Sequence, residues 1–215
     1  MELGQIHRAA VACFARQGYA ATGIRELGAA VGLNSATLYH YVGGKQELLL
    51  GVISGCLTAM LAGAREAQTP ADPAQRLAAL VGFHVGFTAS NPQTARVAEY
   101  EMRSLSPEHR QSMQGLRDEY ERLFAAVLHD GERAGAFHTP DLSLARLAIM
   151  EMGTGVAHWY RPSGRLELAQ VQQEFIAMAL RILGAAPPTA TTLPLPVRLA
   201  SEPDSEPGSI PQGAA

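Results

Sequence analysis

Apolar residues recur at every third or fourth position along most of the chain, which is the spacing of one face of an α-helix. The first such stripe contains Leu3, Ile6 and Ala10 and predicts a helix over residues 3–17, ended by Gly18. The sequence has no run in which apolar and polar residues alternate, as they do in a half-buried strand. The pattern therefore predicts an all-α fold.

Proline marks the start of several longer helices. A capping residue followed by proline recurs at Asp72-Pro73, Asn91-Pro92, Ser106-Pro107 and Thr139-Pro140. An earlier helix opens at Lys45 and is long enough to join two parts of the chain as a rigid rod. The helices expected from the fourth onward are 45–67, 73–89, 92–102 or 103, 107–133, 141–159 and 167–183.

Two short helices joined by a tight turn are predicted between Thr22 and Val42. Thr22 and Asn34 are suitable N-caps, because each side chain can accept a hydrogen bond from an unpaired amide of the first turn. Gly32 lies where a chain leaving a helix takes a positive φ. Leu38 is expected to be buried, whereas the opposite face of the second helix is polar and aromatic. This arrangement is typical of a helix-turn-helix, whose second helix enters the DNA major groove.

The stretch ATLYHYVGGKQELL resembles the end of the DNA-binding domain of TetR-family transcriptional regulators. The family pattern is Thr-Leu-Tyr, two residues, Phe, a short loop and Lys-x-x-Leu. The chain matches it and the segment before it at Gly18, Thr22, Gly32, Leu33, Thr37, Leu38, Tyr39, Lys45 and Leu48. It departs at Val42, where Phe is usual, and at Gly28, where Ala is usual.

The resemblance implies a homodimer that binds a palindromic double-stranded DNA operator. Thr22, Tyr41 and Lys45 are expected to contact phosphates, and Ser35, Thr37 and His40 to contact bases. The full set of predicted DNA-binding residues is Thr22, Arg25, Asn34, Ser35, Thr37, His40, Tyr41 and Lys45. Dimerisation is expected through a four-helix bundle made by helices 141–159 and 167–183 of each subunit.

Three regions follow from the pattern and the resemblance together. Residues 1–46 are expected to form a three-helix DNA-binding domain, and residues 47–184 a six-helix ligand-binding and dimerisation domain. Residues 185–215 hold seven of the 13 prolines and no aromatic residue. Such a segment buries too little apolar area to offset the entropy of ordering it, so we expect a disordered tail.

The resemblance also implies a small-molecule effector bound among the helices of the second domain. The candidate ligand-binding residues are Phe83, His84, Phe87, Tyr100, Met113, Tyr120, Phe124 and Trp159, each of which could equally be ordinary core packing. The segment Trp159-Tyr160-Arg161-Pro162-Ser163-Gly164 resembles one in a TetR subgroup that responds to acyl-CoA thioesters. An anionic acyl-CoA would need arginines near it, and five are available, each of which could instead be solvated: Arg96, Arg103, Arg117, Arg122 and Arg165. A drug-like or aromatic effector is the alternative.

The charge, motifs and apolar runs of the chain argue against some classes of protein but do not by themselves establish its function. The net charge of the 215 residues is −3, but residues 1–50 carry four basic and three acidic side chains, so DNA binding must rely on placed donors and helix N-termini. No nucleophile–base motif, phosphate-binding loop or metal-ligand spacing is present, so we expect no enzyme, cofactor or metal. The chain has neither a signal peptide nor an apolar run of ~20 residues, which predicts a cytoplasmic protein outside the membrane.

The two cysteines, Cys13 and Cys56, leave one further alternative open. Both lie among apolar residues of predicted helices, as buried structural thiols usually do. A redox-controlled DNA-binding protein that uses these two residues is the other interpretation.

Overall fold

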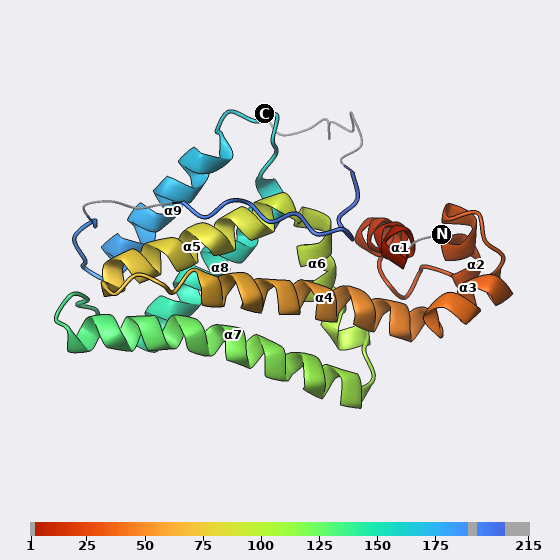
Figure 1. Cartoon of the computed structure of the whole chain (residues 1–215), viewed down its shortest axis with the longest axis horizontal. Helices are drawn as coiled ribbons and strands as arrows, with labels where there is room; N and C mark the ends of the chain where they lie inside the picture. The colour runs from red at the N-terminus through yellow and green to blue at the C-terminus, as the bar shows by residue number, and fades with distance from the viewer. Residues whose placement is uncertain (1–2, 189–192, 205–215) are drawn as a thin grey trace.

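The computed structural model describes residues 3–188 and 193–204, and every element in them is helical, which confirms the all-α prediction. Figure 1 shows the arrangement. The elements are α1 (Leu3–Gln17), α2 (Ile24–Ala30), α3 (Ser35–Val42), α4 (Lys45–Glu66), α5 (Pro73–Ser90), α6 (Pro92–Tyr100), the 3₁₀ turn η1 (Glu101–Ser104), α7 (Pro107–Arg133), α8 (Leu142–Trp159) and α9 (Leu168–Ile182).

Helices α1, α2 and α3 gather at one end of the elongated molecule, at the right of Figure 1. From there α4 runs back along the molecule between α5 and α7, as the rod expected from the sequence. By length and composition α4 could cross a membrane. Its buried residues Leu49, Ile53 and Leu61 belong instead to the protein's own core, so we interpret it as a core helix.

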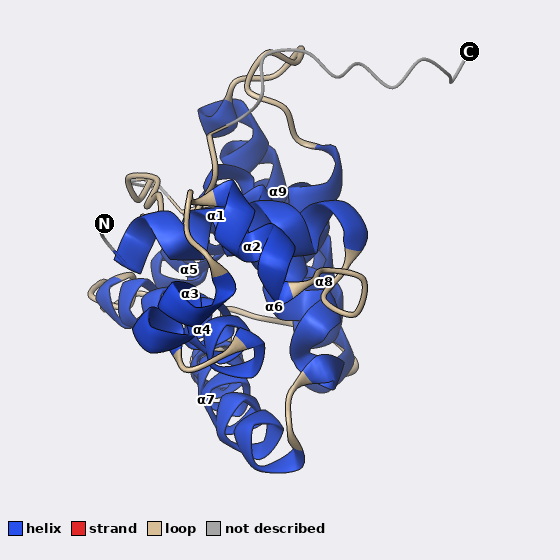
Figure 2. Cartoon of the chain, turned by 90° about the vertical axis from the view of Figure 1, so that its right-hand side faces the viewer, coloured by secondary structure: helices blue, strands red, loops and turns tan. Residues whose placement is uncertain are grey.

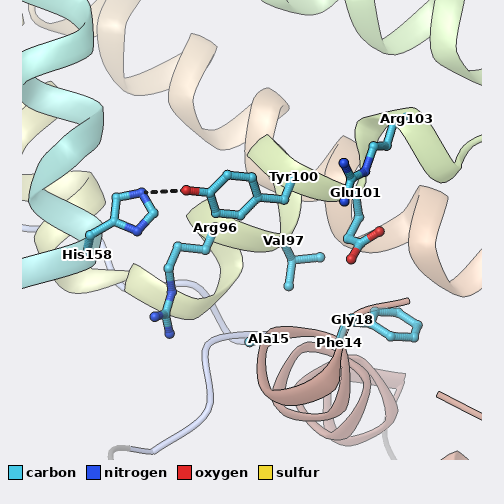
Figure 3. Close-up of a pocket in the computed structure, with 9 residues that line it drawn as sticks. All are labelled: Phe14, Ala15, Gly18, Arg96, Val97, Tyr100, Glu101, Arg103 and His158. Carbon is cyan, nitrogen blue, oxygen red and sulfur yellow. Dashed lines mark hydrogen bonds between the residues drawn. The ribbon is translucent and has the colours of Figure 1, made fainter. Parts of the chain in front are cut away.

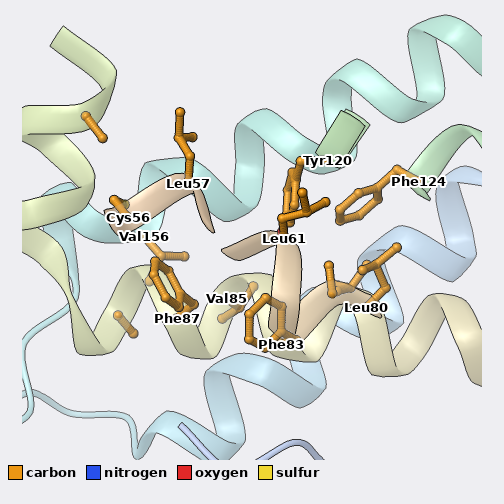
Figure 4. Close-up of a cluster of buried hydrophobic side chains, with 14 of the residues drawn as sticks. Cys56, Leu57, Leu61, Leu80, Phe83, Val85, Phe87, Tyr120, Phe124 and Val156 are labelled. Carbon is orange, nitrogen blue, oxygen red and sulfur yellow. The ribbon is translucent and has the colours of Figure 1, made fainter. Parts of the chain in front are cut away.

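Helices α4 to α9 form the larger part of the molecule. Helix α5 lies at its centre and contacts each of the others. Every residue from Leu80 to Ala89 is buried, which is expected of a helix that is apolar on all sides. Figure 4 shows Phe83 and Phe87 of α5 in one cluster with Leu57 and Leu61 of α4 and with side chains of α7 and α8. This cluster joins the rod to the rest of the larger part.

Two of the four predicted cap-and-proline starts hold as expected. Asp72 accepts a hydrogen bond from the amide of Gln75 at 2.8 Å, and Ser106 accepts one from the amide of His109 at 3.3 Å. The prediction for Thr139-Pro140 is wrong by two residues, because Asp141 caps α8 through the amide of Leu144 at 3.0 Å.

The prediction for Asn91 is also wrong. Its side chain makes no capping hydrogen bond to α6, although Pro92 does begin that helix. The buried amide of Asn91 instead binds the backbone of a segment far along the chain, at Val197 and Leu199. A local cap pattern cannot reveal that a remote segment competes for the same side chain.

The expected disorder of residues 185–215 is contradicted for residues 193–204, which pack against α5 and α6. Glu202 in this segment is only 3% exposed. Leu193 and Leu199 pack against the hydrophobic core, and Glu202 accepts hydrogen bonds from the amides of Gln93 and Thr94, so this segment has both apolar and polar contacts. Residues 189–192 and 205–215, where the same expectation applied, lie outside the described residues.

Candidate DNA-binding surface and effector site

The turn between α2 and α3 is built as the sequence predicts. Asn34 caps α3, its Oδ1 accepting a hydrogen bond from the amide of Thr37 at 2.8 Å. Gly32 takes a φ of +70°, and Leu38 is fully buried beneath the helix. These features fix the direction in which α3 leaves the turn.

Gly28 has a steric role in the same turn. The amide of Leu33 donates to the Gly28 carbonyl at 2.8 Å, which folds the turn back onto α2. A Cβ added to Gly28 would lie 2.6 Å from the Leu33 carbonyl oxygen. Glycine therefore stands where the family usually has Ala, and the turn here is too tight for a side chain at this position.

Thr22 does not have the role predicted for it. The N-cap of α2 is Gly23, and the Thr22 hydroxyl donates to the carbonyl of Gly18 at 2.8 Å. The residue is 1% exposed, so its hydroxyl cannot reach a phosphate from this position. We therefore remove Thr22 from the expected phosphate contacts.

The outward face of α3 carries polar and aromatic side chains at the end of the molecule that faces the viewer in Figure 2. His40 and Tyr41 are exposed, and Ser35 and Thr37 are partly exposed. Tyr39 is 50% exposed on the same helix, although the sequence pattern identified it only as part of the family motif. Its exposure adds Tyr39 to the residues available to DNA.

Arg25 and Lys45 flank this helix. Arg25 is exposed on α2, whereas Lys45 begins α4 and is partly buried. The Lys45 ammonium lies 4.1 Å from the centre of the Tyr19 ring, a cation–π contact, and burial lowers its pKa. A phosphate must therefore compete with the Tyr19 ring for this ammonium.

Six of the eight candidate ligand-binding residues lie close together in the core. Phe83, His84, Phe87, Met113, Tyr120 and Phe124 are each 6% exposed or less, and Figure 4 labels four of them. In this structure they are core side chains: the Phe83 and Phe87 rings contact each other, and so do those of His84, Tyr120 and Phe124, with ring centres of His84 and Phe124 5.9 Å apart. An effector among them would have to displace this packing.

A polar network lies inside this apolar region. His84 Nε2 lies 3.2 Å from the Met150 carbonyl, which can only accept, so Nε2 carries the proton. Its Nδ1 must then accept from the Tyr120 hydroxyl, 2.8 Å away. Thr154 Oγ1 also lies 3.2 Å from Nε2. Burial lowers the pKa of His84 to about 4 and raises that of Tyr120, so both groups are neutral at pH 7.

The other two candidates lie apart from this cluster. Tyr100 is 52% exposed and lines a cleft of about 340 Å³ between α1, α6 and α8. Figure 3 shows its hydroxyl directed at His158, with Arg96 and Arg103 projecting on opposite sides of it. Of the five arginines considered for an anionic ligand, these two line this cleft.

Trp159 is 50% exposed and its ring stacks on that of Phe175, 6.2 Å away. It lies on the outer side of α8, on which Leu144 and Leu147 are 64% and 47% exposed. Large apolar side chains exposed together mark an interaction surface. Val156 of α8 and Val171 of α9 are buried within the chain's own core, so they are not available for packing against a second subunit.

Both cysteines are buried and unpaired. Burial raises the pKa of Cys56 to about 12 and also raises that of Cys13. Because the thiolate is the form that oxidants attack, these thiols are poorly suited to redox sensing. The geometry therefore disfavours the redox-controlled alternative.

Two protein-family models match separate parts of the chain. Residues 6–52 match the family described as bacterial regulatory proteins, tetR family. Residues 70–183 match the tetracyclin repressor-like C-terminal domain. The first match runs from within α1 through α2 and α3 into the first part of α4, and the second covers α5 to α9.

Individual relatives agree with these matches. The HTH-type transcriptional repressor KstR2 of Mycobacterium tuberculosis is 31% identical over 182 residues, covering 82% of this chain and 90% of KstR2. The solved structure of the ketosteroid transcriptional regulator KstR2 has a TM-score of 0.77 at 26% identity, covering 83% of this chain and 92% of that one.

Two further solved structures share the architecture. A regulatory protein in the tetR family from Rhodococcus RHA1 has a TM-score of 0.80 at 31% identity, covering 86% of this chain and all of that one. AibR, solved with isovaleryl coenzyme A and operator DNA, has a TM-score of 0.74 at 19% identity, covering 84% of this chain and 97% of AibR. At that identity, AibR supports the shared fold alone.

Proposed function

The chain belongs to the TetR family of bacterial regulatory proteins, and we propose that it is a cytoplasmic transcriptional repressor released from its operator by a small effector. The observation that carries the proposal is the exposed polar and aromatic face of α3, held by the Asn34 cap at the free end of the molecule. Repression is inferred from the similarity to KstR2.

The proposed DNA contacts lie on α2, α3 and the start of α4. Ser35, Thr37 and His40 read bases, because they lie on the outward face of the recognition helix. The other proposed contacts, Arg25, Asn34, Tyr39, Tyr41 and Lys45, position the protein on the backbone. Residues 1–46 act as the DNA-binding domain in this proposal, and residues 47–184 as the effector and dimerisation domain.

The repressor is proposed to act as a homodimer through the outer face of α8 and α9. Leu144, Leu147 and Trp159 are each about half or more exposed there, which suits burial against a second copy. Two copies then present two α3 helices to two half-sites of a palindrome. Half-site centres would be separated by about 34 Å, one turn of DNA, or a multiple of it.

The effector is proposed to bind around His84 and Tyr120, where the core combines aromatic side chains with hydrogen-bonding groups. A carbonyl oxygen in the effector could accept from the Tyr120 hydroxyl in place of His84 Nδ1. An acyl-CoA thioester has such a carbonyl, and Arg96 and Arg103 beside Tyr100 could meet its anionic part. Trp159 is reassigned to the subunit interface. A drug-like or aromatic effector remains the alternative.

A gel-shift titration of duplex DNA selected by the wild-type protein, with and without a mixed set of acyl-CoA thioesters, tests this function. Release of bound DNA by a thioester supports the effector class. Retention with every thioester, but release by an aromatic compound, favours the alternative. Tyr120→Phe keeps the ring and removes only the hydroxyl, so we expect it to bind DNA normally and to need more effector for release.

A further inference from the structure

Residues 193–204, called the C-terminal strap below, lie along the effector domain and reach the DNA-binding domain. In Figure 1 the strap is the deep blue segment that runs alongside α5 towards α1. It begins at Leu193 and Pro194, which lie over Gly82 of α5, where an added Cβ would come within 3.3 Å of the proline ring. The strap is therefore seated on a part of α5 without a side chain.

Asn91 holds the middle of the strap. This fully buried residue lies at the corner between α5 and α6. Its Nδ2 donates to the Val197 carbonyl at 2.6 Å, and its Oδ1 accepts from the Leu199 amide at 2.7 Å. The second Nδ2 proton goes to the Phe87 carbonyl at 2.9 Å. Asn91 thus binds the strap with both sides of its amide and has no donor left over.

Glu202 takes the capping role that Asn91 leaves open. Its carboxylate oxygens accept from the amides of Gln93 at 3.0 Å and Thr94 at 2.9 Å, in the first turn of α6. The residue is 3% exposed, and a buried carboxylate is costly unless it is hydrogen-bonded. The two amides and the positive end of the helix supply that compensation. The start of α6 is therefore fixed by a residue more than 100 positions later in the chain.

The strap also reaches α1. Arg8 of α1 donates to the Ala200 carbonyl at 3.1 Å, two residues before Glu202. At the other end of α6, Glu101 accepts from the amide of Tyr19, just after α1, at 3.0 Å. Helix α6 is thus linked to the DNA-binding domain near both of its ends. At its N-terminus the link passes through the strap to Arg8, and after its C-terminus Glu101 binds the amide of Tyr19 directly.

We propose that the C-terminal strap is an intramolecular latch that positions α6 relative to α1 and thereby sets the affinity of the protein for its operator. The effect of the latch on operator affinity rests on the proposed function, whereas the contacts of the strap do not. An effector can shift an equilibrium only by its differential binding to two states. If those states differ in the position of α6, releasing Glu202 from α6 changes the equilibrium even without effector.

Hydrogen exchange of the full-length protein tests the contact. We expect Glu202→Ala to speed exchange at the Gln93 and Thr94 amides by about tenfold or more. Asp204→Asn is the matched control, because it removes a carboxylate whose side chain is fully exposed. Unchanged exchange in Glu202→Ala would overturn the latch. If that variant folds poorly, Arg8→Ala cuts the α1 link alone and should speed exchange in residues 198–201.

Operator affinity, measured without effector, tests the consequence. Glu202→Ala and Arg8→Ala should each change the Kd for DNA by about fivefold or more, the lower range of allosteric coupling, and Asp204→Asn should not. An unchanged Kd in a variant with accelerated exchange refutes the coupling. Wild-type protein that binds no DNA would contradict the proposed function instead, while the exchange measurement still decides the contact.

Discussion

The surroundings of His84 determine its protonation state and make the stability of the protein depend on pH. It is buried, hydrogen-bonded and neutral, with its pKa lowered to about 4 mainly by desolvation. In the unfolded chain the same imidazole titrates near 6.5. Between these values the unfolded state holds a proton that the folded state lacks, so the free energy of unfolding falls as the pH falls through this window.

The expected loss is up to about 3 kcal/mol between pH 6.5 and pH 4, on top of any contribution from carboxylates. Denaturant unfolding of the wild type and of His84→Gln across this range measures it. The variant should show a shallower dependence on pH, whatever its stability at pH 7. His138→Gln, at an exposed site, is the control. Parallel curves for the wild type and His84→Gln would refute the assignment.

Lys45 carries a second prediction at this scale. If its ammonium leaves the Tyr19 ring for a phosphate, Lys45→Ala should weaken binding to all DNA sequences alike. The slope of log K against log salt should fall in magnitude by about one. Arg122→Ala, an exposed cation on α7, should leave the slope unchanged. A wild-type slope in Lys45→Ala would show that this lysine does not contact DNA.

At the scale of elements, the α2–α3 turn depends on Gly28. Gly28→Ala places a Cβ 2.6 Å from the Leu33 carbonyl oxygen, a backbone atom that cannot move aside cheaply. We expect a loss of about 1–3 kcal/mol in the free energy of unfolding and weaker DNA binding. Gly55→Ala in α4 makes the same change with no atom within 4 Å. That control should be neutral or stabilising by up to about 1 kcal/mol, and equal losses in both variants would contradict the steric account.

Elements that depend on neighbours in sequence were predictable from the sequence. The bounds of α1 and α7 and the Asn34 cap follow from apolar spacing and local hydrogen-bonding side chains. Features that depend on residues distant in the sequence could not be predicted from it. Asn91-Pro92 carries the local signal of a cap, yet Glu202 supplies it, because tertiary packing brings the strap to α6.

The candidate site shows the same division. Exposure of His40 and Tyr41 follows from the two faces of one helix, which the sequence pattern indicates. Burial of Thr22 and exposure of Trp159 depend on which helices pack beside them, which one sequence does not reveal. Aromatic residues at core spacing likewise could not be divided, from their spacing alone, into the His84 cluster and the cleft at Tyr100.

At the scale of the whole molecule, the proposed function predicts that two copies of the chain bind DNA together. Leu147→Glu places a charge in the proposed interface of α8 and α9, where Leu147 is 47% exposed in the single chain. Burying that charge without a partner costs several kcal/mol, so we expect a monomer by analytical ultracentrifugation, with loss of operator binding. Leu195→Glu is the control, because this leucine is 87% exposed outside both helices. A Leu147→Glu dimer as tight as the wild type would place the interface elsewhere.

The most direct test of the account is selection of duplexes from a random-sequence DNA library by the full-length protein, which works for any operator sequence. The account predicts enrichment of an inverted repeat whose half-sites lie on one face of the duplex, about one helical turn or a multiple of it apart. Selection with Ser35→Ala, Thr37→Ala and His40→Ala should shift the enriched bases within each half-site. Failure to enrich any sequence, or enrichment that ignores all three substitutions, would contradict the claim that this chain is a dimeric regulator reading DNA through α3.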